Sequence, residues 1–313
     1  MKVVIIDDNA ANAMLIESWV QQLDDVETVC FNDSADGLAW CEANEPDLIF
    51  LDQMMPKMSG TEFLTRYRSV DTEAAVPIVM VTANADRQTL YTALEAGATD
   101  FLSKPFDPTE FLARTRNLLR LRANHLELKE TIERLHYLAT TDTLTETANR
   151  AHFFDRLNEE IDRARRNDKP LSLAVLDADR FKVINDTFGH AAGDTVLKTL
   201  ADTARSMLRN HDIVGRLGGE EFAICMPETN LEEGIHVCER LRAAIEENRV
   251  QLEGRSLKVT VSIGVSQFDS KTDAADSLLK RADFLLYRAK DSGRNQVIGV
   301  NENKMSEFSS MAS

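Results

Sequence analysis

The 313-residue sequence contains few residues that cross-link the chain or interrupt helices and strands: it has 4 cysteines, 7 prolines and 13 glycines. The cysteines have no metal-ligand spacing and lie in apolar or helical patterns, so we interpret them as reduced, structural thiols of a cytoplasmic protein. They are Cys30, Cys41, Cys225 and Cys238. No apolar run approaches the roughly 18 residues of a membrane span, and the run 3–6 is too short for a signal peptide. We therefore expect no membrane insertion.

Basic residues are also scarce, with 36 Lys and Arg against 52 Asp and Glu and a net charge of −16. This balance disfavours a phosphate-binding DNA surface over the whole molecule. The chain also has no helix-turn-helix segment, so a transcription factor is disfavoured and no nucleic-acid partner is expected. The hydrophobic content of 43% is that of a globular protein, and the length suits two domains.

Short apolar runs alternate with helical patterns over the first 106 residues. Runs that are apolar at consecutive positions suit strands buried on both faces, as in parallel sheets covered by helices on each side. The five predicted strands are Val3–Ile6, Val26–Cys30, Leu48–Leu51, Ile78–Val81 and Thr99–Leu102. This part of the chain is therefore predicted to be a doubly wound α/β domain.

Polar residues stand at the carboxyl ends of these strands, where the loops of such sheets form the site. They are Asp7, Asp8, Asp52, Thr82 and Lys104. Three converging carboxylates repel each other unless a divalent cation neutralises them, and an oxygen-rich site suits Mg²⁺. The hydroxyl and the ammonium complete a pocket matched to a phosphoryl group on Asp52. Taken singly, Asp7 could be a helix cap and Lys104 a surface charge.

These residues strongly resemble the receiver domain of bacterial response regulators, over essentially all of residues 1–120. The resemblance implies that Asp52 is the phospho-acceptor and that a histidine kinase is the phosphodonor. The ligands implied for one Mg²⁺ are Asp7, Asp8, Asp52 and the backbone carbonyl of Met54. Thr82 and Lys104 are implied to read the phosphoryl group. Phe101 is implied to be the switch aromatic, although it could equally be a plain core residue.

The chain then reads as one long helix from Leu118 to Asp142, without Gly or Pro. Residues at alternating spacings of three and four form a coiled-coil seam, with one polar position. The seam is Leu118, Leu121, His125, Leu128, Ile132 and Leu135. So narrow a stripe favours a partner helix; a helix that lies on its own domain is the alternative. About two and a half heptads are too few for a stable dimer, so we predict a homodimer through the receiver and the linker helix together.

Residues 171–300 mix strands and helices in a pattern that indicates an α+β domain with antiparallel strands. The predicted strands are Leu171–Leu176, Phe222–Met226 and Val259–Val265, and the predicted helices are Thr195–Leu208, Leu231–Asn248 and Ala275–Ser292. Two cations, Lys290 and Arg294, end the last of these helices and suit terminal phosphates. Helix C-termini attract cations in any case, so this motif alone decides little.

The segment Gly218-Gly219-Glu220-Glu221 carries the most information. The two glycines interrupt a strand-like pattern and predict a hairpin tip that needs positive φ. We expect the two glutamates behind the tip to point to opposite faces, so that one can hold a metal while the other reaches something else. Asp177 closes a buried strand and can share Mg²⁺ with the hairpin, and Mg²⁺ favours a nucleotide triphosphate. A solvated acidic hairpin is the alternative for this segment alone.

Together these residues closely resemble the GGDEF family of diguanylate cyclases, here with the sequence Gly-Gly-Glu-Glu-Phe, from about Asp142 to Val300. The resemblance implies condensation of two GTP molecules into cyclic di-GMP, with release of two pyrophosphates. The ligands implied for two Mg²⁺ are Asp177, the Ala178 carbonyl, Glu220 and Glu221. The implied catalytic residues are Glu220, Glu221 and Lys182, with Glu221 at the metal or as the base for the 3′-hydroxyl. The residues implied to bind GTP are Asn185 and Asp194 at the guanine and Lys182, Lys290 and Arg294 at the phosphates.

The resemblance also marks Arg209 and Asp212 as an RxxD inhibitory site for the product, with Arg240 as a helper, although a lone helical Arg is usually just solvated. One departure from the family lies in the entry segment of this domain. Glu146 and Thr147 stand where the family usually has Gly and an apolar residue. We expect the glutamate to strain or reshape that turn.

We therefore predict a phosphorylation-controlled diguanylate cyclase. Its predicted parts are a receiver domain (1–117), a coiled-coil linker helix (118–140), a GGDEF domain (141–300) and a disordered tail (301–313). The alternative is a degenerate domain that binds GTP or cyclic di-GMP only as a receptor. Such relatives typically lose the glycines or acids of the hairpin, whereas all of them are present here.

Overall fold

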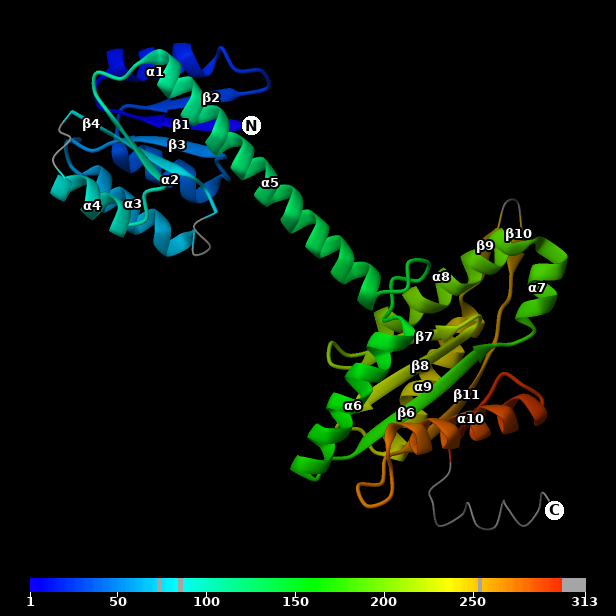
Figure 1. The fold of residues 1–313 in the computed structure, drawn as a ribbon. Coiled ribbons are helices and arrows are strands. Elements are labelled where there is room, and N and C mark those ends of the chain that lie inside the picture. Colours follow the sequence, from blue (N-terminus) through cyan, green and yellow to red (C-terminus); the bar gives the residue numbers. More distant parts are fainter. Residues whose placement is uncertain (72–74, 84–86, 253–254, 300–313) are drawn as a thin grey trace. The chain divides into compact units, whose positions relative to one another are not determined.

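The structure, a computed structural model, describes residues 1–71, 75–83, 87–252 and 255–299, with side chains throughout except at 87–90. The chain divides into two compact units, Met1–Glu133 and Arg134–Ser313 (Figure 1). The predicted tail lies outside the described residues. Among the helices of the described part, none is long and apolar enough to cross a membrane.

The first unit is a doubly wound α/β domain, which confirms the predicted fold class. Its parallel sheet has the order β2-β1-β3-β4-β5. The strands are β1 (Lys2–Ile6), β2 (Glu27–Phe31), β3 (Leu48–Asp52), β4 (Ile78–Thr82) and β5 (Asp100–Ser103). The helices are α1 (Ala10–Val20), α2 (Ser34–Ala43), α3 (Gly60–Val70), α4 (Arg87–Glu95) and the first part of α5 (Pro108–Thr140).

Both faces of this sheet are buried, as the consecutive apolar residues of its strands require. Val3 and Ile5 of β1 face a core shared with α1 and α5, whereas Val4 and Ile6 face a second core shared with α2 and α3. Figure 1 shows α1 and α5 on one side of the sheet and α2, α3 and α4 on the other. Because all five strands are parallel, their carboxyl ends and the polar residues there lie at one edge of the sheet.

Helix α5 begins at Pro108, ten residues before the predicted start, and continues without a break for 33 residues. Proline at the first helical position and Asp107 before it explain this start, because the Asp107 Oδ1 accepts from the N–H groups of Thr109 and Glu110 at 2.8 and 3.0 Å. The predicted seam is wrong at Leu118, which is 8% exposed and belongs to the core of the first unit. It is already covered by its own domain and cannot face a partner helix.

The other apolar seam positions are exposed in the described part of the chain. Leu121, Leu128, Ile132 and Leu135 are between 57% and 61% exposed. His125 is half-buried and lines two hollows beside α5, which it shares with Arg122 and Ala75. An apolar stripe therefore starts at Leu121 and continues along the helix to Leu135.

The second unit is the predicted α+β domain, built on a sheet of the order β12-β11-β6-β8-β7. Neighbouring strands are antiparallel except β11 and β12. Its strands are β6 (Leu171–Ala178), β7 (Ile213–Gly218), β8 (Glu221–Pro227), β11 (Val261–Gln267) and β12 (Val297–Gly299), with a separate pair β9 (Val250–Leu252) and β10 (Arg255–Leu257). Its helices are α6 (Arg150–Asn167), α7 (Phe181–Phe188), α8 (His190–Met207), α9 (Leu231–Glu247) and α10 (Ala275–Asp291).

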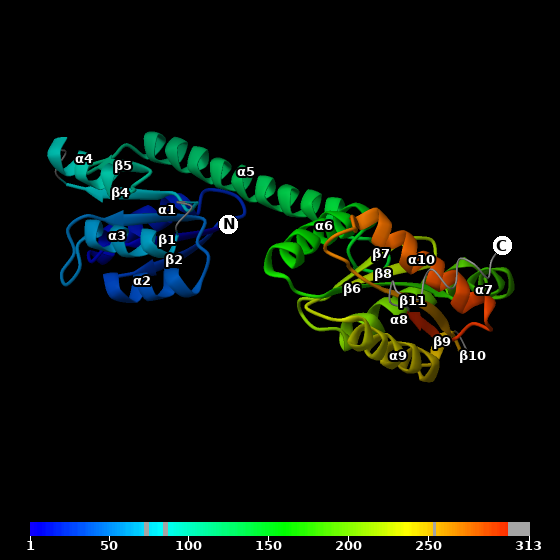
Figure 2. The ribbon, with the colours of Figure 1, turned by 90° about the horizontal axis from the view of Figure 1, so that it is seen from below.

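Helices cover both faces of this second sheet (Figure 2). Residues of α8 and α9 share a core with Ala174 and Leu176 of β6, and residues of α6 and α10 share another with Leu173 and Val175. Side chains alternate along a strand, so Asp177 points to the same face as Val175, towards α10. Helices α6 and α7 and the short strands β9, β10 and β12 were not predicted.

Candidate active site and phosphoryl site

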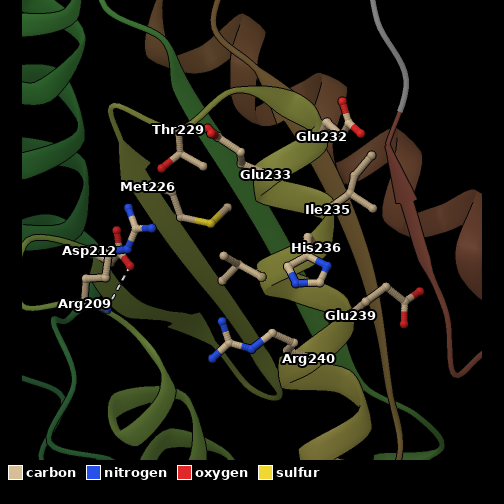
Figure 3. A pocket seen from close by; sticks show the side chains of 11 residues that line it. Arg209, Asp212, Met226, Thr229, Glu232, Glu233, Ile235, His236, Glu239 and Arg240 are labelled. Atoms are coloured by element: carbon tan, nitrogen blue, oxygen red, sulfur yellow. Dashed lines mark hydrogen bonds between the residues drawn. The ribbon is translucent and has the colours of Figure 1, made fainter.

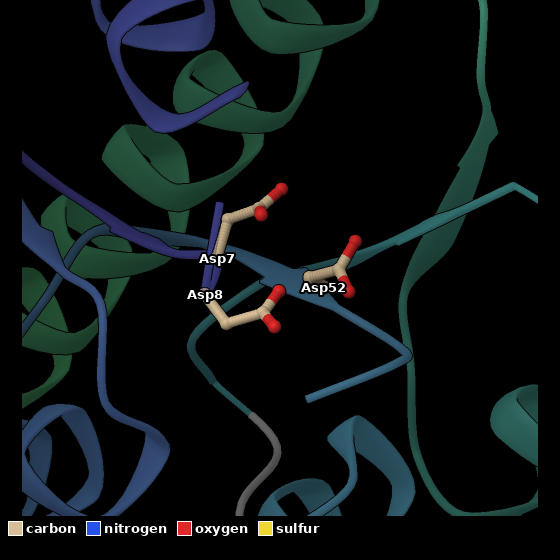
Figure 4. A group of neighbouring side chains, drawn as sticks. All are labelled: Asp7, Asp8 and Asp52. Carbon is tan, nitrogen blue, oxygen red and sulfur yellow. The ribbon is translucent and has the colours of Figure 1, made fainter. Parts of the chain in front are cut away.

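Three carboxylates gather at the carboxyl edge of the first sheet (Figure 4). Asp7 and Asp8 directly follow β1, and Asp52 ends its neighbour β3, so the sheet order brings them together. One oxygen from each lies within 4.8 Å of the others. Asp7 and Asp52 are buried and Asp8 is exposed. Such a set of crowded carboxylate oxygens, open on one side, has the chemistry that Mg²⁺ requires.

Lys104 partly neutralises this cluster. Its Nζ lies 2.9 Å from Asp7 Oδ2 and 2.6 Å from Asp52 Oδ1. Burial raises the pKa of the Asp52 carboxyl, and the negative charge of Asp7 adds to this, while the hydrogen bond from Lys104 acts in the opposite direction. Burial opposes the charge of Lys104, but its bonds to both carboxylates outweigh burial and raise its pKa. Lys104 is therefore a protonated bridge between the two buried acids.

The other residues assigned to this site have different placements. Thr82 is buried and ends β4, and its carbonyl accepts from the Lys104 N–H at 2.7 Å. The N–H of Met54 donates to Asp52 Oδ2 at 2.9 Å, while the Met54 side chain is exposed. Phe101 is half-buried and packs against the core beneath α3 and α4. Its role as a switch and the metal bond of the Met54 carbonyl stay predictions.

In the second unit, the hairpin tip differs from the prediction by one residue. Gly218 pairs with Glu221 across the hairpin, so the two-residue turn is Gly219-Glu220. Gly218 and Gly219 have φ of 150° and 52°, as predicted for this turn. Glu220 therefore lies in the turn, and only Glu221 belongs to a strand. The expected alternation of the two glutamates along one strand was therefore wrong.

Asp177 and Glu221 lie directly opposite each other on β6 and β8, so their side chains share one face of the sheet. The Nζ of Lys290, from the last turn of α10, lies 2.8 Å from Asp177 Oδ2. Burial raises the pKa of Asp177 to about 6; Lys290 opposes this, and Glu220 and Glu221 add to it. This crowding of acids is what a divalent cation would relieve, and the residues present fit Mg²⁺.

The predicted guanine site has one unusual feature. The Oδ1 of Asn185, on α7, is buried without a hydrogen-bond partner among the described residues. It faces Gly193 on α8, where a Cβ would come within 2.0 Å of that oxygen. Asp194 follows directly and is exposed. A buried acceptor with no partner, next to a position that only glycine fits, is what a hydrogen-bonding ligand requires.

The remaining predicted substrate residues surround the end of β6. Ala178 is the last residue of that strand and is buried. Lys182 is exposed in the first turn of α7, and Arg294 is exposed in the turn after α10. Lys182 thus lies at the start of α7 and Arg294 in the turn after α10, and their contact with phosphate stays a prediction.

Arg209, Asp212 and Arg240 line one cavity of about 570 Å³ between the start of β7 and α9 (Figure 3). The backbone N–H of Arg209 donates to Asp212 Oδ2 at 2.9 Å. The Asp212 side chain is only 4% exposed, and its Oδ1 has no hydrogen-bond partner in the described part of the chain. Glu232, Glu233 and Glu239 make the other side of the cavity acidic. The structure thus brings the three predicted residues together around a buried carboxylate.

Sequence reasoning missed Arg216, which links the entry segment to the hairpin. Its Nε donates to the Gly219 carbonyl at 2.9 Å, and its Nη1 lies 3.2 Å from Asp142 Oδ1. Ala148 pairs with β7 as well, through bonds to Val214 and Arg216. The signal in the sequence that could have indicated this role is the position of the arginine, two residues before the glycine pair. The residues after α5 are therefore bonded to the catalytic hairpin itself.

The strain expected at Glu146 is present in the backbone. Glu146 has φ 54°, the left-handed region that favours glycine. Its N–H donates to the Asp142 carbonyl at 2.8 Å, and its own carbonyl accepts from Arg205 at 3.2 Å. Thr147 is buried, and its hydroxyl lies 2.9 Å from that of Thr145. These bonds hold a glutamate in a backbone conformation suited to glycine.

The fold and these sites define a two-domain regulator that combines a receiver with a nucleotide-cyclase domain. Residues 139–296 match the family model "Diguanylate cyclase, GGDEF domain", and residues 3–116 match "Response regulator receiver domain". The chain therefore belongs to the GGDEF family of diguanylate cyclases and carries an N-terminal receiver domain.

Individual relatives agree with this assignment. The chain is 35% identical over 301 residues to the response regulator PleD of Caulobacter vibrioides, which covers 95% of this chain and 65% of PleD. It is 46% identical over 159 residues to diguanylate cyclase DgcP of Pseudomonas aeruginosa, covering 51% and 24%. The chain thus spans just under two thirds of PleD and about a quarter of DgcP.

A similar solved structure is the coiled coil and GGDEF domain of DgcB from Caulobacter crescentus in complex with c-di-GMP. It has a TM-score of 0.56 and 30% identity, and the match covers 60% of this chain and all of that one. The diguanylate cyclase SiaD from Pseudomonas aeruginosa, solved with its activator SiaC, has a TM-score of 0.51 and 34% identity, over 61% and 74% of the two chains.

Proposed function

We propose that this chain is a diguanylate cyclase that condenses two GTP molecules into cyclic di-GMP and two pyrophosphates. The observation that carries the proposal is the placement of Asp177 opposite Glu221, with Glu220 in the adjoining turn. The buried, unpartnered Asn185 Oδ1 supports guanine as the base, because it can accept from the guanine N–H groups. Asp194, in the next helix, would accept from the same edge.

Within this proposal, two Mg²⁺ ions bound by Asp177, the Ala178 carbonyl, Glu220 and Glu221 would neutralise the triphosphate and polarise the reacting phosphorus. Lys290 exchanges its ion pair with Asp177 for a contact with the terminal phosphates, and Lys182 from α7 and Arg294 from the turn after α10 contact them as well. Glu221 accepts the proton of the 3′-hydroxyl as that oxygen attacks the α-phosphorus of the other GTP, and pyrophosphate leaves.

One domain holds one GTP, so closing a ring with two phosphodiester bonds requires two domains that face each other. We propose a homodimer formed by the receiver and by α5, whose residues Leu121, Leu128, Ile132 and Leu135 are exposed. The stripe is continuous with a helix anchored in the receiver, which supports a role in coupling the two halves.

We further propose that a histidine kinase phosphorylates Asp52 and thereby activates the cyclase. A phosphoryl group on Asp52 adds charge beside Lys104 and Thr82, which can draw it inward and shift the receiver surface. The Mg²⁺ of this site would be bound by Asp7, Asp8, Asp52 and the Met54 carbonyl. Asp52→Asn removes the acceptor and keeps the shape of the side chain.

Product inhibition is the last part of the proposal. Arg209 and Arg240 can contact the guanine and phosphate groups of cyclic di-GMP, and the unpartnered Asp212 Oδ1 can accept from its guanine N–H. Asp212 immediately precedes β7, the first strand of the hairpin that carries Glu220 and Glu221. Bound product would therefore hold the cyclase domain in an unproductive arrangement.

The test is formation of cyclic di-GMP from GTP and Mg²⁺ by the full chain, followed by chromatography. Glu221→Gln should lower the rate at least about a hundredfold, as loss of a metal or base group does. The control Glu247→Gln, an exposed carboxylate at the end of α9, should leave the rate unchanged. Wild-type rates in Glu221→Gln would overturn the assignment of the site.

Two further measurements test the regulation. A beryllium fluoride adduct, which stands in for the phosphoryl group, should raise the rate of the wild type and leave Asp52→Asn at its basal rate. Arg209→Ala should keep the initial rate and remove the slowing as product accumulates. Equal product inhibition in that variant would refute the inhibitory site without affecting the cyclase assignment.

A further inference from the structure

Asp179 is a buried carboxylate close to the active site that the proposed mechanism does not use. It lies two residues after Asp177, is 7% exposed, and accepts three hydrogen bonds. Ser262 Oγ donates to its Oδ1 at 2.7 Å, and Thr260 Oγ1 and the Asn295 N–H donate to its Oδ2 at 2.7 and 3.0 Å. Both of its oxygens are occupied, so its geometry suits a structural tie better than a metal ligand.

The third of these bonds joins two loops that are 116 residues apart in the sequence. One loop leaves β6 with Asp177 and Ala178 and enters α7, where Lys182 stands. The other leaves α10 with Lys290 and carries Arg294. The Asp179 carboxylate thus ties the segment that follows the proposed metal-binding end of β6 to the turn that carries Arg294.

The backbone on both sides of this bond is strained. Arg180, next to Asp179, has φ 57°, and the consecutive residues Arg294 and Asn295 have φ 68° and 48°. Non-glycine residues rarely adopt such angles, and they keep them only where the surrounding structure fixes them. A carboxylate that binds the N–H of Asn295 supplies such a constraint. Arg242 Nη1, which donates to Asn295 Oδ1 at 2.8 Å, supplies a second.

We propose that Asp179 is a positioning residue for the triphosphate of GTP. It holds the turn of Arg294 in its left-handed conformation and so fixes where the Arg294 guanidinium lies relative to Asp177, whose end of β6 would hold the metal. This inference rests on the proposed function, because it presumes a triphosphate at Asp177 and Arg294. Asp179 itself contacts neither the reacting atoms nor the metal.

The test is a double-mutant cycle read by the Kd of GTP in the presence of Mg²⁺, together with KM and kcat. Asp179→Ala should weaken GTP binding at least tenfold in the wild-type background. In the Arg294→Ala background the same change should add less than about threefold, because the group that it positions is already absent. Asp179→Ala should raise KM for GTP, and the factor by which kcat falls should be smaller than the factor by which KM rises.

Two variants separate positioning from plain stability. Ser262→Ala removes the bond to Oδ1 and keeps the tie to Asn295, so GTP binding should change less than about threefold. Asp179→Asn can keep the oxygen that faces Asn295, since the Ser262 hydroxyl can turn to accept from the amide, and should recover most of the affinity. If Asp179→Ala does not fold, Asp179→Ser replaces it in the cycle, because its hydroxyl is too short to reach Asn295.

Equal weakening by the Asp179 change in both backgrounds would refute positioning through Arg294. A kcat lowered only in proportion to the folded fraction, with KM unchanged, would show a merely structural role and also refute it. A wild-type protein that binds GTP yet forms no cyclic di-GMP would overturn the proposed function, while the binding cycle would still decide on Asp179. A wild-type protein that binds no GTP would overturn both.

Discussion

The stripe on α5 leads to a quantitative prediction about assembly. In the double variant Leu128→Asp/Ile132→Asp, two side chains that are 59% and 57% exposed in the chain become carboxylates. Among the described residues, neither side chain belongs to a core cluster of either unit, so the fold of each unit should be retained. What the variant should lose is the contact between two copies of the helix.

The size of the effect follows from the exposed surface. Full burial of a Leu or Ile side chain contributes about 1.5–3 kcal/mol, so burying the remaining exposed part contributes about 1.3 kcal/mol for each. Two positions on two chains give about 5 kcal/mol, and unpaired charges in the seam add to this loss. Since 1.4 kcal/mol is a factor of ten, dimer affinity should fall by at least about a thousandfold.

Sedimentation velocity over a dilution series measures this change, and the cyclase rate on the same samples tests its consequence. The rate per chain should fall with the dimer fraction, and activation by beryllium fluoride should be lost. The matched control is Ala123→Asp, an exposed position about 200° around the helix from Leu121. If the double variant remains dimeric and is activated as strongly as the wild type, the stripe is only a tether and the reasoning is wrong.

Three other predictions concern single sites. If Asp177 binds Mg²⁺ as proposed, it does so ionised, and its pKa is raised to about 6, so protons should compete with the metal on the acid side; the Mg²⁺ affinity in GTP turnover should be about tenfold lower at pH 5 than at pH 7. Gly193→Ala should raise the KM for GTP at least about tenfold, because its Cβ would meet Asn185 Oδ1 at 2.0 Å, and an unchanged KM would remove Asn185 from the guanine site. Glu146→Gly should raise the free energy of unfolding by about 1 kcal/mol in urea titrations, by relieving the strain at φ 54°; Glu146→Ala, which keeps that strain, should not.

The receiver could be predicted from sequence in detail because its signals are local. Runs of consecutive apolar residues predicted five strands, and the observed bounds differ by at most one residue at each end, as for Val26–Cys30 against Glu27–Phe31. The position of Asp7 and Asp52 at strand ends then brings them together, whatever the helices do. Residue type and strand order alone determine this cluster.

The wrong predictions share another cause, because a single sequence does not show which side chains the rest of the fold covers. Leu118 fits the heptad spacing, yet it packs into the receiver core, because α5 begins within that domain. Strand alternation applied to Glu220 failed because the turn includes it. Partners distant in sequence, such as Lys290 for Asp177 and Arg216 for Asp142, depend on the tertiary fold and carry no local pattern.

The bonds of Arg216 to Asp142 and to the Gly219 carbonyl bear on how this protein can be divided and recombined. An excised cyclase domain that starts at the helix Arg150–Asn167 would lose Asp142 and the pairing of Ala148 with β7, and with them two supports of the hairpin. Chimeras with another sensor are therefore best joined within α5, before Thr141. An insertion of seven residues there returns the helix to within about 20° of its original phase, whereas three or four residues do not keep the stripe in line.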